Sequence, residues 1–124
     1  EHEVGSIVDL RSAGSGARVY MGRGSVHHVA FRARDDEEQQ SWRETITNAG
    51  IPVTTVQDRC YFHSIYFREP GGVLFEIATD TPGFGIDESE EELGRKLQLP
   101  PWFESQREKL EAQLPRLVLP DERS

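Results

Sequence analysis

Two apolar-rich runs joined by a tight turn constrain the fold of this chain most. The runs are Phe62–Arg68 and Val73–Thr79, and the turn between them is Glu69-Pro70-Gly71-Gly72. Proline and glycine are typical turn residues, so the pattern predicts an antiparallel hairpin. Because side chains alternate between the two faces of a strand, one face of the second run is bulky and the other carries a carboxylate. The bulky face comprises Val73, Phe75 and Ile77, and the other comprises Leu74, Glu76 and Ala78.

An earlier extended run, residues 26–34, places two histidines side by side in an apolar context. In a strand His27 shares a face with Val29 and Phe31, which predicts that it points toward the core. His28 lies on the other face next to a small residue, which leaves space in front of its imidazole. A histidine in that position is well placed to bind a metal. On this stretch alone, however, one solvated and one hydrogen-bonded histidine are the simpler interpretation.

Residues 36–49 have the pattern of a helix with one buried face. Asp36 and Gln39 fit the spacing of a capping box at its start. Gly50 and Pro52 predict its end. Apolar side chains recur at i, i+4 and i+7, as on a helical stripe; they are Trp42, Ile46 and Ala49. We expect this stripe to pack on the core face of the first strand.

The remaining segments complete a β-α-β-β-β order. The β-branched run 53–57 predicts another short strand between the helix and the hairpin. We expect residues 1–24 to be an extended segment or linker from a preceding module, 25–80 to be the module itself, and 81–124 to be a loop with C-terminal helices. Those helices are predicted from Ser89 to about Leu97, and over residues 102–114.

Composition narrows the class of protein. A length of 124 residues suits one domain with a modest core. The net charge of −8 argues against nucleic acid or an anionic membrane as a partner. A single cysteine, Cys60, excludes an intrachain disulfide and favours a reducing compartment such as the cytoplasm. No apolar run approaches the roughly 18 residues needed to span a bilayer.

Four residue types that suit an oxygen-rich, anionic substrate are expected around one concavity. Glu76 is a carboxylate in an apolar strand, so it must pair, bind a metal or face water. Together with His28 it offers the imidazole and carboxylate that iron(II), manganese or zinc accept. Tyr66 is expected on the same side as Glu76, and Arg59 at the entrance to that strand. Taken singly, Tyr66 as a packing residue and Arg59 as a solvated turn residue are the simpler interpretations.

Two stretches resemble a known superfamily. Residues 24–31 and 61–80, the second of which contains Arg-Glu-Pro-Gly-Gly-Val-Leu-Phe-Glu-Ile-Ala-Thr-Asp, are similar to the vicinal oxygen chelate (glyoxalase/bleomycin resistance/extradiol dioxygenase) superfamily. More narrowly, they resemble the C-terminal module of hydroquinone-type ring-cleaving dioxygenases. The resemblance implies an α+β fold: a βαβββ module with a cupped mixed sheet, one packing helix and a C-terminal helical tail.

The resemblance also implies a function and a set of site residues. It implies a non-haem iron(II)-dependent, extradiol-type dioxygenase acting on hydroquinone- or catechol-like aromatics and O2. His28 and Glu76 would be metal ligands, and His27, Arg59 and Tyr66 would contact substrate or the ligands. Manganese, zinc and nickel remain alternatives to iron.

The family's other histidine ligand belongs to a preceding module, which this sequence does not show. His2 and His63 are weak candidates for that ligand, and His63 is expected to face away from the metal. The ligand could instead come from a second module or from the second copy of a homodimer. A glyoxalase-like metal-dependent isomerase or lyase, and a non-catalytic small-molecule-binding module, remain alternative functions.

Overall fold

The computed structural model describes residues 7–9, 22–115 and 118, so most of the expected linker 1–24 lies outside the described residues. The described chain contains a four-stranded mixed sheet with strand order β1-β4-β3-β2. Its strands are β1 (Val29–Ala33), β2 (Gln57–Asp58), β3 (Phe62–Arg68) and β4 (Leu74–Pro82). β1 pairs with β4 in parallel, whereas the other two pairs are antiparallel. The hairpin predicted from the sequence is therefore the centre of the sheet.

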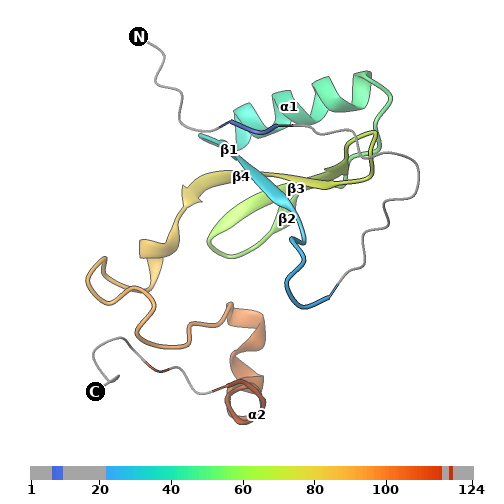
Figure 1. Ribbon diagram of the computed structural model, residues 1–124. Coiled ribbons are helices and arrows are strands. Elements are labelled where there is room, and N and C mark those ends of the chain that lie inside the picture. Colours follow the sequence, from blue (N-terminus) through green and yellow to red (C-terminus); the bar gives the residue numbers. More distant parts are fainter. Residues whose placement is uncertain (1–6, 10–21, 116–117, 119–124) are drawn as a thin grey trace.

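One helix, α1 (Asp36–Asn48), follows β1 and lies over one face of the sheet (Figure 1). The element order is βαβββ, and the predicted α+β fold is confirmed. The chain then leaves the sheet through two 3₁₀ helices, η1 (Phe84–Ile86) and η2 (Pro101–Gln106), and ends the described part in α2 (Arg107–Gln113). Figure 1 shows α2 apart from the sheet, on the side opposite α1.

The core lies between α1 and the sheet. Its buried apolar members are Ala33 from β1, Ile46 from α1, Ile65 from β3 and Ile77 from β4. The register sets Phe31 and Ile65 beside Ile77, so these side chains share the helix-covered face. Alternation then places Glu76 and its neighbours on the opposite, open face. The face assignments made for the hairpin from the sequence agree with this arrangement.

The contact of α1 with the sheet differs from the prediction. Trp42 is 48% exposed and Ala49 is exposed, whereas Gln39 is only 1% exposed. Gln39 takes the buried place because its side-chain amide donates to the backbone carbonyls of His63 and Ile77, at 2.8 Å each. A buried amide is tolerated where it makes such bonds. The prediction of a buried apolar stripe is thus wrong for Trp42 and Ala49 and holds for Ile46.

The start of α1 also differs. Asp35, not Asp36, is the N-cap, and its carboxylate accepts from the backbone N–H of Glu38 at 2.8 Å. The side chain of Glu38 accepts in turn from the backbone N–H of Arg34. The predicted capping box therefore lies one residue too late, because Gln39 is used inside the core.

Two other elements were predicted wrongly. In the segment 53–57 Val53 forms a single bridge with Phe67, and the strand begins only at Gln57. Residues 90–94 form turns instead of a helix, and Gly94 has a positive φ of 78°, which ends any helical path. The later helix is confirmed in outline, although its first half, residues 101–106, is a 3₁₀ helix.

Candidate active site

Side chains from three segments converge on the open face of the sheet. Tyr66 on β3 is registered opposite Glu76 on β4, and Ala30 on β1 flanks Glu76 on its other side. His28 lies in the extended lead-in directly before β1, where the register brings it close to the same point. The small side chain of Ala30 leaves room above Glu76 for the imidazole.

Glu76 is the centre of this cluster and is only 3% exposed. Its Oε1 accepts a hydrogen bond of 2.7 Å from the hydroxyl of Tyr66 and a second one from the hydroxyl of Ser64. Its Oε2 lies 2.7 Å from Nε2 of His28. In the described part of the chain its partners are therefore two neutral hydroxyls and one imidazole. Since a buried carboxylate needs compensation for its charge, this arrangement favours a cation at Oε2.

Arg59 supports Tyr66 from outside the sheet. Its Nε and Nη2 donate to the Tyr66 hydroxyl at 3.3 Å and 3.2 Å, and the guanidinium lies 5.3 Å from the centre of the Tyr66 ring. The turn between β2 and β3 places Arg59 there: Cys60 has a positive φ of 69°, and its N–H donates to Asp58. Arg59, Tyr66 and Glu76 thus form a chain of contacts that runs from an exposed guanidinium through a phenol to a buried carboxylate.

His27 lies beside His28 and not in the core. It is exposed, and its Nδ1 lies 2.8 Å from Nδ1 of His28. The predicted orientation of His27 is thus wrong. The cause is that β1 begins only at Val29, so no ladder of hydrogen bonds imposes strict alternation on the two histidines. One of the two Nδ1 atoms must carry a proton for this contact to be a hydrogen bond.

The five residues singled out from the sequence are therefore brought together: His27, His28, Arg59, Tyr66 and Glu76 form one connected network. Sequence reasoning missed Ser64 as a member. The signal was present, because Ser64 has the same parity as Tyr66 on β3 and shares its face.

The described residues supply only part of a metal site. Across residues 7–9, 22–115 and 118, no group of three or more His, Cys, Asp or Glu side chains is arranged to hold a metal ion. His63 lies on the helix-covered face, where its Nδ1 is 2.6 Å from Asp36. His2 falls outside the described residues. His28 and Glu76 thus remain the pair of donors on the open face, and their chemistry suits a divalent metal.

A second, exposed ion pair lies at the far end of the same face. Arg32 on β1 donates from Nε to both oxygens of Asp80 on β4, at 2.8 Å and 2.7 Å. These hydrogen bonds lower the pKa of Asp80 below its ordinary value of 3.8.

Comparison with protein families decides what kind of module this is. The family model described as glyoxalase/bleomycin resistance protein/dioxygenase superfamily matches residues 3–77. The chain belongs to this superfamily. The matched residues include β1, α1, β2, β3 and Glu76, so the candidate site lies within the family module.

Individual relatives are dioxygenases by name. The chain is 50% identical over 109 residues to the "Putative ring-cleaving dioxygenase MhqO" of Bacillus subtilis (strain 168), which covers 88% of this chain and 35% of that protein. It is 42% identical over 93 residues to the chlorohydroquinone/hydroquinone 1,2-dioxygenase of Sphingobium indicum, covering 73% of this chain and 28% of that protein. The chain therefore spans about a third of the length of these relatives.

A solved structure supports the fold. The crystal structure of a protein titled a putative dioxygenase, from Bacillus subtilis, superposes with a TM-score of 0.75 at 52% identity, covering 79% of this chain and 32% of the other. This superfamily module is thus homologous to ring-cleaving dioxygenases over part of their length. Within the described residues, the structure contains no helix long and apolar enough to cross a membrane.

Proposed function

We propose that this chain is a module of an iron(II)-dependent ring-cleaving dioxygenase that acts on hydroquinone- or catechol-like aromatics. The observation that carries the proposal is the buried carboxylate of Glu76, whose Oε2 lies 2.7 Å from Nε2 of His28 on the open face. Relatives named as dioxygenases, at 42% to 50% identity, support this reaction class.

The donor set of this face fits a divalent metal in part. His28 and Glu76 would hold it, since an imidazole nitrogen and a carboxylate oxygen are typical ligands of non-haem iron(II). Iron(II), when bound, would supply the redox chemistry and open coordination positions that cleavage of an aromatic ring by oxygen requires. A further histidine would have to come from a second βαβββ module, in the same protein or in a second copy of this chain.

The other residues of the network would handle the substrate's charge and protons. Arg59, which is exposed and donates to the Tyr66 hydroxyl, would stabilise negative charge on a substrate hydroxyl group placed over this face. Tyr66 would donate or accept a proton there, because its hydroxyl is held between a guanidinium and a carboxylate. His27, exposed beside His28, would exchange protons with solvent at the rim.

Two further assignments complete the proposal. The partners are a small aromatic substrate, O2, and the second module that completes the site. The location is cytoplasmic, which a single cysteine without a disulfide favours.

Oxygen consumption tests this proposal. The chain, loaded anaerobically with iron(II), should take up oxygen when hydroquinone or catechol is added, and the Glu76→Gln variant should lose iron binding and uptake together. Glu44→Gln is the matched control, because Glu44 lies exposed on α1, on the other side of the sheet. Well-loaded protein that takes up no oxygen with either substrate would contradict ring cleavage by this chain. Turnover of a hemithioacetal without oxygen would favour a glyoxalase-like isomerase instead.

A further inference from the structure

The two oxygens of the Glu76 carboxylate have different surroundings. Oε1 accepts from two hydroxyls, those of Ser64 and Tyr66, whereas Oε2 faces only His28 among its described partners. A carboxylate oxygen has two lone pairs, so Oε1 is saturated and Oε2 is not. The hydrogen bonds therefore fix both the position of the Glu76 carboxylate and its rotation. In this orientation Oε2 faces His28 and can contact an ion bound beside it.

Ser64 is the less obvious of the two donors. It is fully buried, at 0% exposure, and is registered opposite Ala78 and not opposite Glu76. Its hydroxyl reaches Glu76 along the diagonal between the strands, which the small side chain of Ala78 leaves open. Packing alone does not require a hydroxyl at this buried position. The hydrogen bond from Ser64 to the buried carboxylate therefore indicates a more specific role than filling space.

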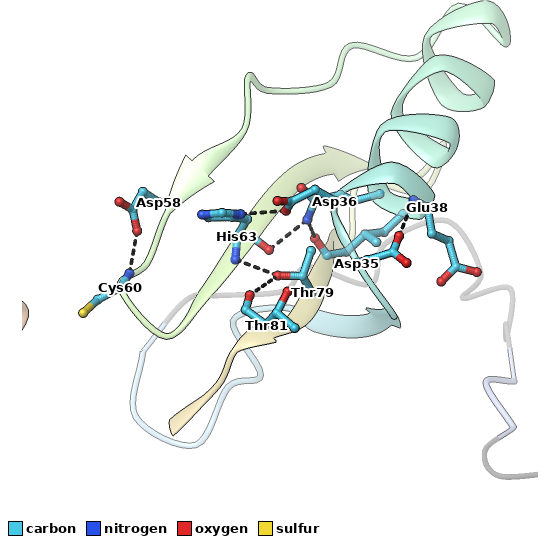
Figure 2. A network of polar contacts seen from close by, with 10 residues as sticks. Asp35, Asp36, Glu38, Asp58, Cys60, His63, Thr79 and Thr81 are labelled. Carbon is cyan, nitrogen blue, oxygen red and sulfur yellow. Dashed lines mark hydrogen bonds and ion pairs between the residues drawn. The ribbon is translucent and has the colours of Figure 1, made fainter. Parts of the chain in front are cut away.

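A bulge in β4 holds the backbone next to Ser64. Phe62 pairs with Pro82 and Ser64 with Ala78, so three residues of β4, 79–81, lie opposite the single residue His63. The N–H of His63 donates to the Thr79 hydroxyl at 3.0 Å, and this hydroxyl donates to the carbonyl of Thr81 at 2.7 Å (Figure 2). Bulges of this kind redirect side chains next to functional sites.

The other backbone group of His63 is fixed from α1. The Gln39 amide donates to the carbonyl of His63 and to that of Ile77, the residues directly before Ser64 and directly after Glu76. Figure 2 shows the His63 ring turned toward Asp36 at the start of α1. Ser64 and Glu76, which are joined by the hydrogen bond at Oε1, are thus each anchored through the backbone of the adjacent residue.

We propose that Ser64 is a positioning residue that, together with Tyr66, occupies Oε1 of Glu76 so that Glu76 binds the metal through Oε2 alone. The inference rests on the proposed function, because it concerns the same metal. Hydrogen bonds to metal-ligating carboxylates from surrounding side chains typically contribute ten- to a hundredfold to metal affinity. Without Ser64, Oε1 keeps only the hydrogen bond from the Tyr66 hydroxyl and has a free lone pair, which allows the carboxylate to turn and to offer both oxygens.

Cobalt(II) binding to the whole chain tests this role without any need for turnover. Ser64→Ala should weaken cobalt affinity about ten- to a hundredfold in calorimetric titration. It should also change the visible absorption bands of bound cobalt, which report coordination number. Ser64→Cys keeps a side chain of similar shape but offers only a weak donor, so it should also weaken cobalt binding, and it replaces Ser64→Ala in the test if that variant does not fold. Ser64→Thr, which restores the hydroxyl, should recover most of the affinity.

Controls separate this inference from the proposed function. Ser41→Ala on the exposed side of α1 should bind cobalt as the unmodified chain does. If the chain and its His28→Ala variant bind cobalt equally, the metal site itself is wrong. If His28→Ala abolishes binding but Ser64→Ala leaves affinity and spectrum unchanged, the site stands and the role of Ser64 is overturned.

A metal-free crystal structure gives an independent readout. In the Ser64→Ala variant the Glu76 carboxylate should rotate, so that the 2.7 Å contact between Oε2 and His28 Nε2 is lost or shared with Oε1. A carboxylate that keeps its orientation would overturn the positioning role, whether or not this chain binds metal.

Discussion

The two faces of the sheet are built from alternate residues of the same strands, yet they differ in almost every property. Ile65 and Ile77 point under α1 and are buried in an apolar core. Their immediate neighbours Ser64 and Glu76 point the other way and are equally buried, at 0% and 3% exposure, in a polar cluster. Burial alone therefore does not separate structure from function here; the chemistry of the buried group does.

The difference teaches where the free energy of folding comes from. Apolar side chains on the covered face gain from leaving water. Buried polar groups on the open face contribute only a modest net amount, because their hydrogen bonds largely replace those to water. We infer that the covered face contributes most of the stability of the fold and that the open face contributes less.

Truncation of Ile65 should have the largest effect among the tests of this contrast between the two faces. Ile65→Ala should lower the free energy of unfolding by about 2–5 kcal/mol, because it empties part of a fully buried site. Urea unfolding followed by circular dichroism measures the change. Ile86→Ala is the control: Ile86 is 52% exposed, so its loss should cost less than about 0.5 kcal/mol. Equal effects of the two substitutions would show that the covered face is not the main source of stability.

Gln39 is the exception on the covered face and sharpens the comparison. Gln39→Leu keeps the buried volume close to its present value but leaves the carbonyls of His63 and Ile77 without their amide donor. The expected loss is roughly 1–3 kcal/mol in the free energy of unfolding. Gln40→Leu, at the exposed neighbouring position on α1, is the matched control. A Gln39 variant as stable as the unmodified chain would mean that the apolar contact compensates the two carbonyls.

The sequence predicted the faces better than it predicted the helix. Alternation in a strand is a local rule, so the opposite orientations of Ile77 and Glu76 followed from one hairpin. The burial of Gln39 could not be foreseen, because its two acceptors are 24 and 38 residues away in the chain. Trp42 was expected in the core because it shares a helical stripe with Ile46 and Ala49, but the rotation of α1 that buries Gln39 leaves it half exposed.

The candidate site shows the same limit. Glu76, Tyr66 and His28 could be placed from strand parity, although β1 begins only after His28. The contact between His27 and His28 depends on where pairing with β4 begins, which no local pattern records. The face of Ser64 follows from its parity with Tyr66, but its hydrogen bond to Glu76 depends on the register that sets it opposite Ala78.

The exposed pair Arg32–Asp80 should have the smallest effect among the tests of the two faces, because it lies on the open face but is not buried. Hydrogen bonds from Arg32 lower the pKa of Asp80 below 3.8, so the charged carboxylate is favoured in the folded chain. Its contribution to stability is therefore present above the ordinary pKa and is lost as the pH falls through the lower pKa of the folded state. Exposed pairs contribute little, so we expect a small effect.

Asp80→Asn should accordingly shift the urea midpoint slightly downward at pH 7, and this shift should shrink toward zero as the pH falls below 3.8. In an Arg32→Gln background the same substitution should have almost no effect at either pH, because the partner that lowers the pKa is gone. A shift that persists unchanged at low pH would assign the role of Asp80 to its shape and not to its charge. The open face would then contribute to stability through packing, and its contrast with the covered face would be weaker than the buried residues suggest.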